Sequence, residues 1–352
     1  MEQEISAAQA KTHKGVWIFA EQRHGRLIST AYELLNIGRR LASDLSAELS
    51  AVLIGHKVAE HAQDLIEHGA DKVFVHDHPM LENFLEEVYS QLLCELIQKA
   101  SPDKFLLPAS ILGRSVAART AVEARTGLAA DCTELSIRKD SGLLNAVRPA
   151  FGGNLLATIL CENSRPEMAT VRPMAFGRAQ RVAGRQGEVV AVKVEPERFK
   201  PRARFVQFVR EESGEQDIAT CDKIVSGGRG LGDSKGFDLI REFAHTLGAA
   251  VGASRATVDA GWIPYRHQVG LTGRTVRPKL YFACGISGQI QHLAGMSSSE
   301  VIVAINTDSE APMMKLATFS IEGDLYEVVP AIISELKHRR GDAATPSSTN
   351  SH

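Results

Sequence analysis

Short apolar runs alternate with longer amphipathic stretches through the first third of the chain. Runs that are apolar enough to form buried strands lie at 15–20, 50–55, 71–75 and 104–109. Amphipathic segments with helical spacing lie at about 29–47, 58–69, 80–100 and 113–126. Strands that alternate with helices of this length indicate βαβ units and a mostly parallel, doubly wound sheet.

The pattern changes twice before the middle of the chain ends. Further short strands that complete or edge the same sheet are expected at 135–138, 143–148, 154–160 and 168–172. From about 177 to 217 the apolar periodicity weakens and the charge density rises. This composition predicts a linker, with one strand at 204–210.

A second α/β unit begins at about residue 222. Its strands are expected at 223–226, about 249–251, 279–284, 301–306 and 317–321, and its helices at about 235–247, 288–295 and 324–338. The sequence therefore predicts an α/β protein with two domains, each built on a mostly parallel, doubly wound sheet. The expected boundaries are a polar extension at 1–14, domains at 15–215 (with the linker from about 177) and 216–340, and a disordered tail at 341–352.

Charge and composition exclude several classes of protein. The 40 Lys and Arg residues are balanced by 42 Asp and Glu residues, which argues against a nucleic-acid-binding protein. No apolar run has the length of a membrane helix, and the first fourteen residues are too polar for a signal-peptide core, so we expect a cytoplasmic protein with no membrane insertion. The five cysteines form no C-x-x-C pair, and the cluster at 76–78 (HDH) offers no third ligand at usable spacing, so no metal site is expected.

Glycine placement gives the first indication of function. Thirteen of the 29 glycines lie between Gly227 and Gly295. The run at 225–232 (VSGGRGLG) places glycines between a strand and a helix, where backbone amides can approach a phosphate. Its spacing departs from the dinucleotide fingerprint and no acidic partner follows about twenty residues on, so a dehydrogenase of the Rossmann kind is not favoured.

Polar residues follow the other strands of this second unit. In 284–292 (CGISGQIQH), Ser287 is expected to cap a helix whose first amides face an anion, with Gln291 and His292 on its first turn. Arg255 and the Thr272 hydroxyl are further candidates for contact with a ligand rich in heteroatoms. Asn306 and Asp324 follow strands and suit ribose or base recognition, although each could equally be a turn or a helix cap.

Five motifs in this unit occur in an order and spacing known from one family. They are SGGRGLG, AAVGASRATVDAG, HQVGLTGRTVRPKLYFACGISGQIQHLAG, IVAINTD and GDLYEVVP. The run from Ser226 to Pro330 thereby resembles the C-terminal domain of the alpha subunit of electron-transfer flavoprotein. GVWIFAEQ, LLPASILGRSVAAR and MATVRP resemble the first domain of the same family, so the resemblance covers residues 14 to 337.

The resemblance implies a heterodimer in which the N-terminal domain packs on a separate beta subunit and the C-terminal domain holds FAD. Arg255 matches the arginine that lies against the flavin ring, His292 matches the histidine near the pyrimidine carbonyl, and Thr272 is placed to hydrogen-bond the central nitrogen region, so these three would tune the flavin. The positions that match cofactor contacts are Arg229, Ser254, Arg255, Val269, Gly270, Leu271, Thr272, Ser287, Gly288, Gln289, Ile290, Gln291, His292, Asn306, Asp324 and Leu325.

Two positions depart from the family pattern. Leu271 stands where glutamine is common, which leaves only backbone contacts at that point of the loop. Thr307 stands where lysine often follows the asparagine, which removes a cation near the nucleotide end. Both departures predict a cofactor affinity and a reduction potential that differ from those of typical members.

The function that the resemblance implies is electron transfer without a catalytic acid, base or nucleophile. FAD would take electrons from flavin dehydrogenases of the acyl-CoA dehydrogenase type, as in fatty acid β-oxidation, and pass them to a membrane quinone reductase through transient contacts. An alternative is a flavin-based bifurcating complex that uses NADH and ferredoxin, because GVWIFAEQ and VDAGW resemble chains from anaerobes. The beta subunit would hold AMP in the first case and a second FAD in the other. A regulatory nucleotide-binding scaffold is a third reading, but it leaves Arg255, Thr272 and His292 unexplained.

Overall fold

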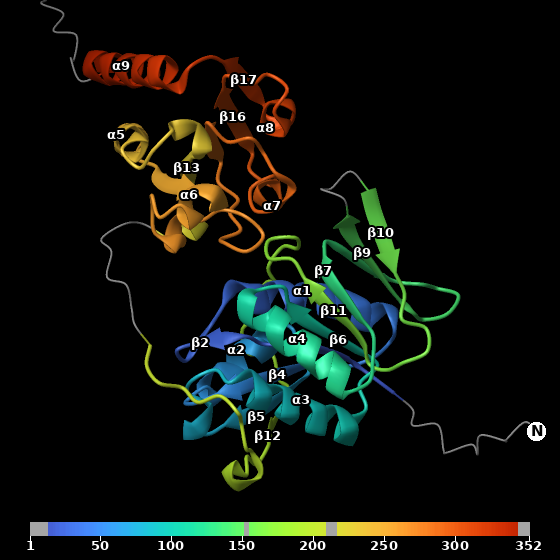
Figure 1. Cartoon of the computed structure of the whole chain (residues 1–352). Coiled ribbons are helices and arrows are strands. Elements are labelled where there is room, and N and C mark those ends of the chain that lie inside the picture. Colours follow the sequence, from blue (N-terminus) through green and yellow to red (C-terminus); the bar gives the residue numbers. More distant parts are fainter. Residues whose placement is uncertain (1–12, 151–154, 209–216, 344–352) are drawn as a thin grey trace, which may run out of the picture. The chain divides into compact units, whose positions relative to one another are not determined.

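The chain is described by a computed structural model that covers residues 13–150, 155–208 and 217–343. The described residues form two compact units, which we call the N-terminal unit (13–208) and the C-terminal unit (217–343) (Figure 1). The expected extension at 1–14 and tail at 341–352 lie almost entirely outside the described residues.

The N-terminal unit is built on a seven-stranded sheet in which every paired strand is parallel to its neighbour. In spatial order its strands are β12 (Glu188–Ala191), β5 (Lys72–Asp77), β4 (Leu49–Gly55), β1 (Val16–Phe19), β6 (Lys104–Pro108), β11 (Glu167–Val171) and β7 (Leu128–Cys132). Every residue of the central strands β4, β1 and β6 is buried. These strands read as continuous apolar runs because helices cover both of their faces.

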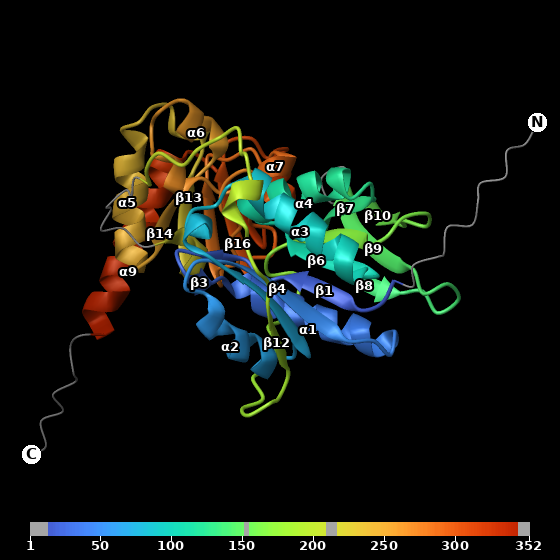
Figure 2. The same ribbon diagram turned by 90° about the horizontal axis from the view of Figure 1, so that it is seen from below.

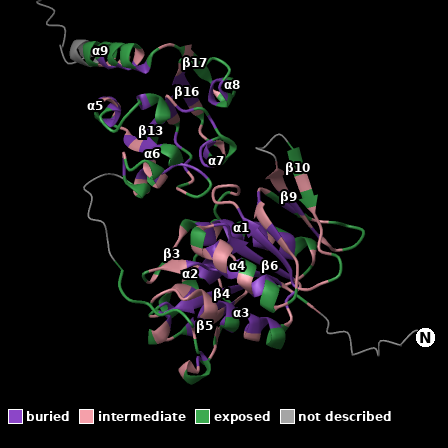
Figure 3. Ribbon diagram, in the orientation of Figure 1, coloured by how far each residue is buried: buried purple, intermediate pink, exposed green. Residues whose placement is uncertain are grey.

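Helices lie on the two faces of this sheet (Figure 2). The helices α1 (Ser29–Asp44) and α2 (Ala62–Glu67) contribute to one apolar cluster, while α3 (Glu86–Ala100) and α4 (Ile111–Glu123) contribute to the cluster on the opposite face. Figure 3 shows the buried residues concentrated in the strands between them. The short elements are β2 (Gln22–Arg23), β3 (Arg26–Leu27), η1 (Ala59–His61), η2 (Pro79–Leu81) and η4 (Pro196–Arg198).

The expectation that all the later strands edge the same sheet is wrong for three of them. The strands β8 (Glu134–Ile137), β9 (Leu144–Ala150) and β10 (Leu155–Ile159) form a separate antiparallel sheet in the order β10-β9-β8. Neighbouring strands of this sheet run in opposite directions, and within the described residues the three strands pair only with one another. The strand β11 enters the main sheet between β6 and β7. The strand β7 was not expected, because its sequence LAADC contains an aspartate and gives only a short apolar run. Its residues are only partly buried in the structure.

The segment expected to be a linker also contains a strand. The strand β12 pairs in parallel with β5 at the edge of the sheet, and its residues are mostly exposed, which explains the missing apolar signal. Lys72 of β5 forms an ion pair with Glu188 of β12, at 2.9 Å between Nζ and Oε2. Residues 204–208 form no strand, and the rest of the strand expected at 204–210 lies outside the described residues.

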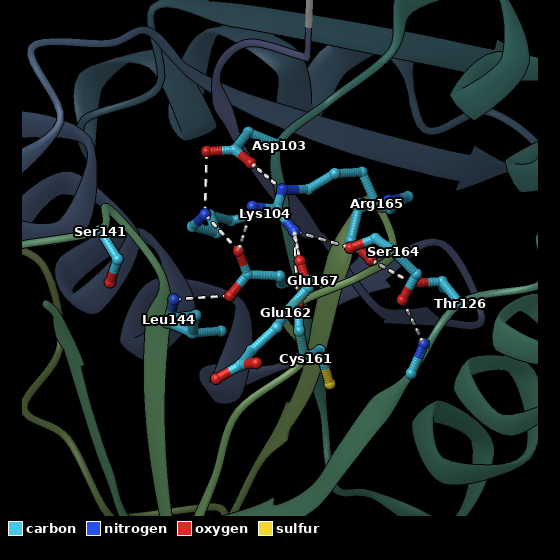
Figure 4. A network of polar contacts seen from close by, with 12 residues as sticks. Asp103, Lys104, Thr126, Ser141, Leu144, Cys161, Glu162, Ser164, Arg165 and Glu167 are labelled. Carbon is cyan, nitrogen blue, oxygen red and sulfur yellow. Dashed lines mark hydrogen bonds and ion pairs between the residues drawn. The ribbon is translucent and has the colours of Figure 1, made fainter. Parts of the chain in front are cut away.

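A buried polar network joins the antiparallel sheet to the main sheet (Figure 4). The carboxylate of Glu167, at the start of β11, accepts a hydrogen bond from the backbone amide of Leu144, at the start of β9, at 2.5 Å. The Arg165 guanidinium donates to Asp103 at 2.8 Å and lies 3.2 Å from Glu167. Lys104 supplies the second cation, with its Nζ 2.9 Å from Asp103, so two cations face two carboxylates in this network.

The C-terminal unit is a five-stranded parallel sheet in the order β14-β13-β15-β16-β17. Its strands are β13 (Lys223–Gly227), β14 (Ala250–Ala253), β15 (Leu280–Cys284), β16 (Val301–Asn306) and β17 (Phe319–Glu322). Its helical segments are η5 (Ile218–Thr220), η6 (Arg229–Leu231), α5 (Gly236–Leu247), α6 (Arg255–Asp259), η7 (Tyr265–His267), α7 (Ile290–Leu293), α8 (Pro312–Leu316) and α9 (Leu325–Ala343). The helices α5 and α9 pack on one face, whereas α8 and Met296 pack on the other.

The fold class predicted from the sequence is confirmed: the protein is α/β, and both large sheets are parallel with helices on both faces. The helices α6 and α8 were not expected, because five residues give too short a periodic signal. Within the described ranges, no helix is both long enough and apolar enough to cross a membrane.

Candidate functional site

A cavity of about 690 Å³ lies at the carboxyl edge of the C-terminal sheet. Arg229 follows β13, Ser254 follows β14, Gly285 follows β15, and Asn306 ends β16. Open parallel sheets bind ligands at this edge, because the loops that leave adjacent strands separate there. The size of the cavity falls in the range of about 300–1,000 Å³ that is usual for cofactor sites.

Most of the residues singled out in the sequence line this one cavity. They are Arg229, Ser254, Arg255, Val269, Gly270, Leu271, Thr272, Ser287, Gly288, Gln289, Gln291, His292 and Asn306. Ile290, Asp324 and Leu325 are not among the lining residues. The side chain of Ile290 is half exposed, and that of Leu325 is buried in the apolar cluster under α9.

Asp324 acts as a helix cap, one of the two roles that the sequence left open. Its Oδ1 accepts a hydrogen bond from the backbone amide of Tyr326 at 2.8 Å, in the first turn of α9. Asn306 forms a turn at the cavity: its Nδ2 donates to the carbonyl of Ile286, and its Oδ1 accepts from the amide of Asp308. Asn306 therefore holds the loop after β15 in place while it lines the cavity.

The expected capping role of Ser287 is wrong. The helix α7 begins at Ile290 rather than at Gly288, its N-cap is Gln289, and no side chain caps it. The carbonyl of Ser287 instead accepts a hydrogen bond from the amide of Met313 at 3.1 Å. The amides that precede α7 remain in an open loop that lines the cavity.

Two glycines permit the close backbone approaches that shape this loop. Gly288 has φ +83°, and a Cβ atom there would lie 2.4 Å from the backbone nitrogen of Met313. A Cβ on Gly230 would lie 2.7 Å from the Cα of Gly285. A larger residue at either position must displace backbone that lines the cavity.

The loop at 268–274 forms one wall of the cavity and is held by backbone hydrogen bonds. The amide of Val269 donates to the carbonyl of Ala253, and the amide of Leu271 donates to the carbonyl of Gln291 at 2.7 Å. Leu271 thus meets α7 through its backbone, and its side chain is 38% exposed. Thr272, which follows Leu271, is the residue of this loop tip that brings a polar side chain to the cavity lining.

His292 is buried beside the cavity and is electrically neutral. Its Nε2 lies 2.9 Å from the hydroxyl of Tyr281, which is buried in β15. Burial lowers the pKa of His292 to about 4, a change larger than the opposite effect of the backbone of Val269. Burial also raises the pKa of Tyr281, so neither group carries a charge at neutral pH.

Arg255 supplies an exposed positive charge at the cavity. It begins α6, and its side chain is 64% exposed. Its Nε lies 3.1 Å from Oδ2 of Asp259, one helical turn later. The carboxylate thereby restrains the guanidinium, and Arg229 adds a second cation to the lining.

Several lining residues were missed by the sequence analysis: Gly230, Ala256, Asp259, Gln268, Gly285, Ile286 and Asp308. The spacing of four between Arg255 and Asp259 is a signal that could have identified the pair once a helix was expected there. Gly230 and Gly285 belong to the glycine turns at 225–232 and 284–292 that the sequence had indicated, whereas Ala256, Gln268, Ile286 and Asp308 carried no signal of their own.

The lining fits a long cofactor that has phosphates and a heteroaromatic ring. Glycine loops bring backbone amides to the cavity, and two arginines supply positive charge. The Oγ of Ser254 is buried without a hydrogen-bond partner in the described structure, as expected of a group that contacts a ligand. Among the described residues no cluster of metal ligands occurs, and Asp77 of the His76–His78 segment accepts backbone hydrogen bonds from Lys57, Val58 and Ala59.

Together the parallel sheet and this cavity define a nucleotide-cofactor-binding α/β protein. Comparison with family models makes the assignment specific: residues 16–197 match the electron transfer flavoprotein domain, and residues 217–297 match the electron transfer flavoprotein FAD-binding domain. The chain belongs to the electron-transfer flavoprotein alpha subunit family, and its cofactor is FAD.

Curated relatives match nearly the whole chain. An electron transfer flavoprotein subunit alpha from Thermoanaerobacterium thermosaccharolyticum is 50% identical over 325 residues, which is 92% of this chain and 98% of the relative. The lactate dehydrogenase (NAD(+),ferredoxin) subunit LctC from Acetobacterium woodii is 38% identical over 96% of this chain and 80% of its own length. The acryloyl-CoA reductase electron transfer subunit beta from Anaerotignum propionicum is also 38% identical, over 95% of this chain and 98% of the relative.

Proposed function

We propose that this chain is the FAD-carrying subunit of a heterodimeric electron carrier. FAD in the cavity of the C-terminal unit would take electrons from flavin dehydrogenases of the acyl-CoA dehydrogenase type and pass them to a quinone reductase. The N-terminal unit would pack on the beta subunit, and the chain would divide functionally near residue 215. FAD supplies the electron chemistry when bound, and the protein supplies binding, orientation and electrostatics.

The observation that carries this proposal is the chemistry of the cavity lining. Within the described residues the lining contains no cysteine, lysine or glutamate. Its histidine, His292, is buried with a pKa near 4 and is a poor proton donor or acceptor at neutral pH. The lining also contains Ser254, Asp259, Ser287 and Asp308, and its glycine turns and two arginines are suited to holding a redox cofactor that carries phosphates.

We propose that Arg255, Thr272 and His292 tune the flavin. A reduced flavin gains negative charge, so the exposed guanidinium of Arg255 at the cavity favours the reduced form electrostatically. Hydrogen-bond donors such as the Thr272 hydroxyl act in the same direction. The remaining lining residues would hold the cofactor, and Asp324 and Leu325 would act from outside the cavity through α9.

The test is to purify the chain together with its beta subunit and to count flavins. One FAD per heterodimer is expected, reduced by an acyl-CoA dehydrogenase with its substrate and reoxidised by a quinone reductase. A complex that binds no FAD, or whose FAD exchanges no electrons with either protein, would contradict the proposal. We also propose a cytoplasmic location, supported by five free cysteines and tested by cell fractionation.

A second candidate is a subunit of a bifurcating complex, and the names of two relatives favour it. One relative is described as a lactate dehydrogenase that uses NAD(+) and ferredoxin, and another as an electron transfer subunit of acryloyl-CoA reductase. In this case the heterodimer holds two flavins, and NADH is oxidised only when ferredoxin is present to accept electrons. The flavin count separates the two candidates.

A further inference from the structure

Gln268 holds the hydroxyl of Thr272 at the cavity. The side-chain amide Nε2 of Gln268 lies 2.9 Å from Oγ1 of Thr272. Gln268 is only 3% exposed, whereas Thr272 is exposed at the cavity, so one partner is anchored in the protein and the other faces the ligand.

The anchor of Gln268 is well defined. Its backbone amide donates to the carbonyl of Tyr265, and its carbonyl accepts from the amide of Arg274 at 2.7 Å. Gly273 gives the side chain its space, because a Cβ atom there would lie 2.9 Å from the Cγ of Gln268. The hydroxyl of Tyr265 donates to the backbone carbonyl of Thr272, which fixes the other end of the turn.

The direction of the hydrogen bond decides what Thr272 can do. An amide nitrogen only donates, so the oxygen of Thr272 is the acceptor in this pair. A hydroxyl has a single hydrogen, and an oxygen that accepts from Gln268 keeps that hydrogen for a different acceptor. We infer that Gln268 is a positioning residue that commits Thr272 to donating its hydrogen bond to an acceptor atom of the bound cofactor.

The orientation of Thr272 is more important in this chain than it would be if residue 271 were a glutamine. Leu271 has no polar side chain, so Thr272 carries the hydrogen-bonding at this tip of the loop. The inference deepens the proposed function, on which it rests, by naming the group that orients one of the tuning residues. It concerns binding of FAD and does not depend on which proteins exchange electrons with it.

The decisive variant is Gln268→Glu in the heterodimer with its beta subunit. A carboxylate has nearly the shape of the amide but only accepts, so it draws the Thr272 hydrogen toward itself. The dissociation constant of FAD should rise about tenfold. The hydrogen bond from Thr272 to the cofactor is then lost, and the Thr272 oxygen lies against the acceptor atom of the cofactor without a hydrogen between them. The absorption spectrum of bound FAD should shift as well.

Thr272→Val removes the hydroxyl and provides the background that separates positioning from a general effect of charge. In that background Gln268→Glu still adds its negative charge, but it should weaken FAD binding by less than about twofold, because the coupled pair no longer exists. Equal losses in both backgrounds, or no loss in the native background, would overturn the inference. Gln186→Glu, at an exposed site in the N-terminal unit, is the matched control and should change nothing.

A second variant covers the case in which Gln268→Glu does not assemble. Gln268→Leu removes the donor without adding an acceptor, so the Thr272 hydroxyl is free to rotate. FAD binding should weaken about threefold in the native background and stay unchanged in the Thr272→Val background. A loss that persists in the valine background would again overturn the inference. A complex that binds FAD normally but accepts no electrons contradicts the proposed function and leaves this result intact.

Discussion

Lys104 and Glu167 form an ion pair inside the N-terminal unit, with 2.7 Å between Nζ and Oε1. They are register partners on the adjacent parallel strands β6 and β11, and their side chains are 0% and 1% exposed. Glu167 also holds the start of β9 through the amide of Leu144. The pair therefore joins two strands of the main sheet and anchors the separate antiparallel sheet.

Lys104→Met should destabilise the N-terminal unit strongly. The substitution removes one partner of a buried ion pair, which costs about 3–5 kcal/mol, and the remaining cation, the partly exposed Arg165, compensates the charge of Glu167 only in part. Urea unfolding of the purified protein, followed by tryptophan fluorescence in a Trp262→Phe background that leaves Trp17 as the chain's reporter, measures the loss. Lys337→Met breaks an exposed pair with Glu242 and should cost less than about 1 kcal/mol. Similar losses for the two variants would show that the buried pair has no special role.

Gly288→Ala should abolish tight FAD binding. The new methyl group would meet the backbone of Met313, and a positive φ adds strain, so the loop before α7 must move. Gly232→Ala is the matched control, because Gly232 has a similar φ of +78° but open space where the Cβ would lie. It should lose only about 1 kcal/mol of stability and retain FAD. Equilibrium dialysis against FAD compares the two variants, and equal FAD retention would refute the steric argument.

Stability should fall with rising pH because of Glu33. This residue of α1 is buried, and burial raises its pKa from 4.5 to about 7, although the amide of Met174 donates to it. The folded state thus binds more protons than the unfolded state between these values. The contribution is complete below about pH 4.5 and is lost as the pH rises through about 7.

Glu33→Gln should remove this pH dependence and stabilise the protein above pH 7 by up to about 3 kcal/mol relative to the ionised glutamate. Thermal unfolding at pH 5, 6, 7 and 8 measures the effect. The exposed Glu60→Gln is the control and should leave the slope unchanged. If the stability of Glu33→Gln still falls with rising pH, the pH dependence comes from other groups.

Arg255→Ala should lower the reduction potential of bound FAD, because the positive charge that favours the reduced cofactor is lost. The stability of the protein should change by less than about 1 kcal/mol, since the pair with Asp259 is exposed. Arg255→Lys keeps the charge and should retain most of the potential. Asp259→Asn should raise the potential, because it removes a negative charge that partly offsets that of Arg255. Dye-equilibration titration of the three variants tests the order, and an unchanged potential in Arg255→Ala would rule out the tuning role.

The βαβ alternation and the strand-end polar residues could be read from the sequence because both are local. Buried parallel strands require continuous apolar runs, and a cofactor edge requires glycine and polar residues directly after them. Thus β1, β4, β6 and most of the cavity lining were predicted. The strands β7 and β12 were not predicted, because they lie at the edges of the sheet, where residues are partly exposed and show little apolar periodicity.

The sequence by itself determined the fold class, the family and the strand ends where most of the cavity-lining residues lie, because periodicity and motif spacing are properties of neighbouring residues. Only the tertiary structure decided the contacts between distant residues. It placed β8, β9 and β10 in a sheet of their own, made Asp324 a helix cap, paired Lys104 with Glu167, and set the Tyr281 hydroxyl against His292. Such contacts depend on which side chains the packed chain brings within hydrogen-bond distance, and no local pattern encodes that distance.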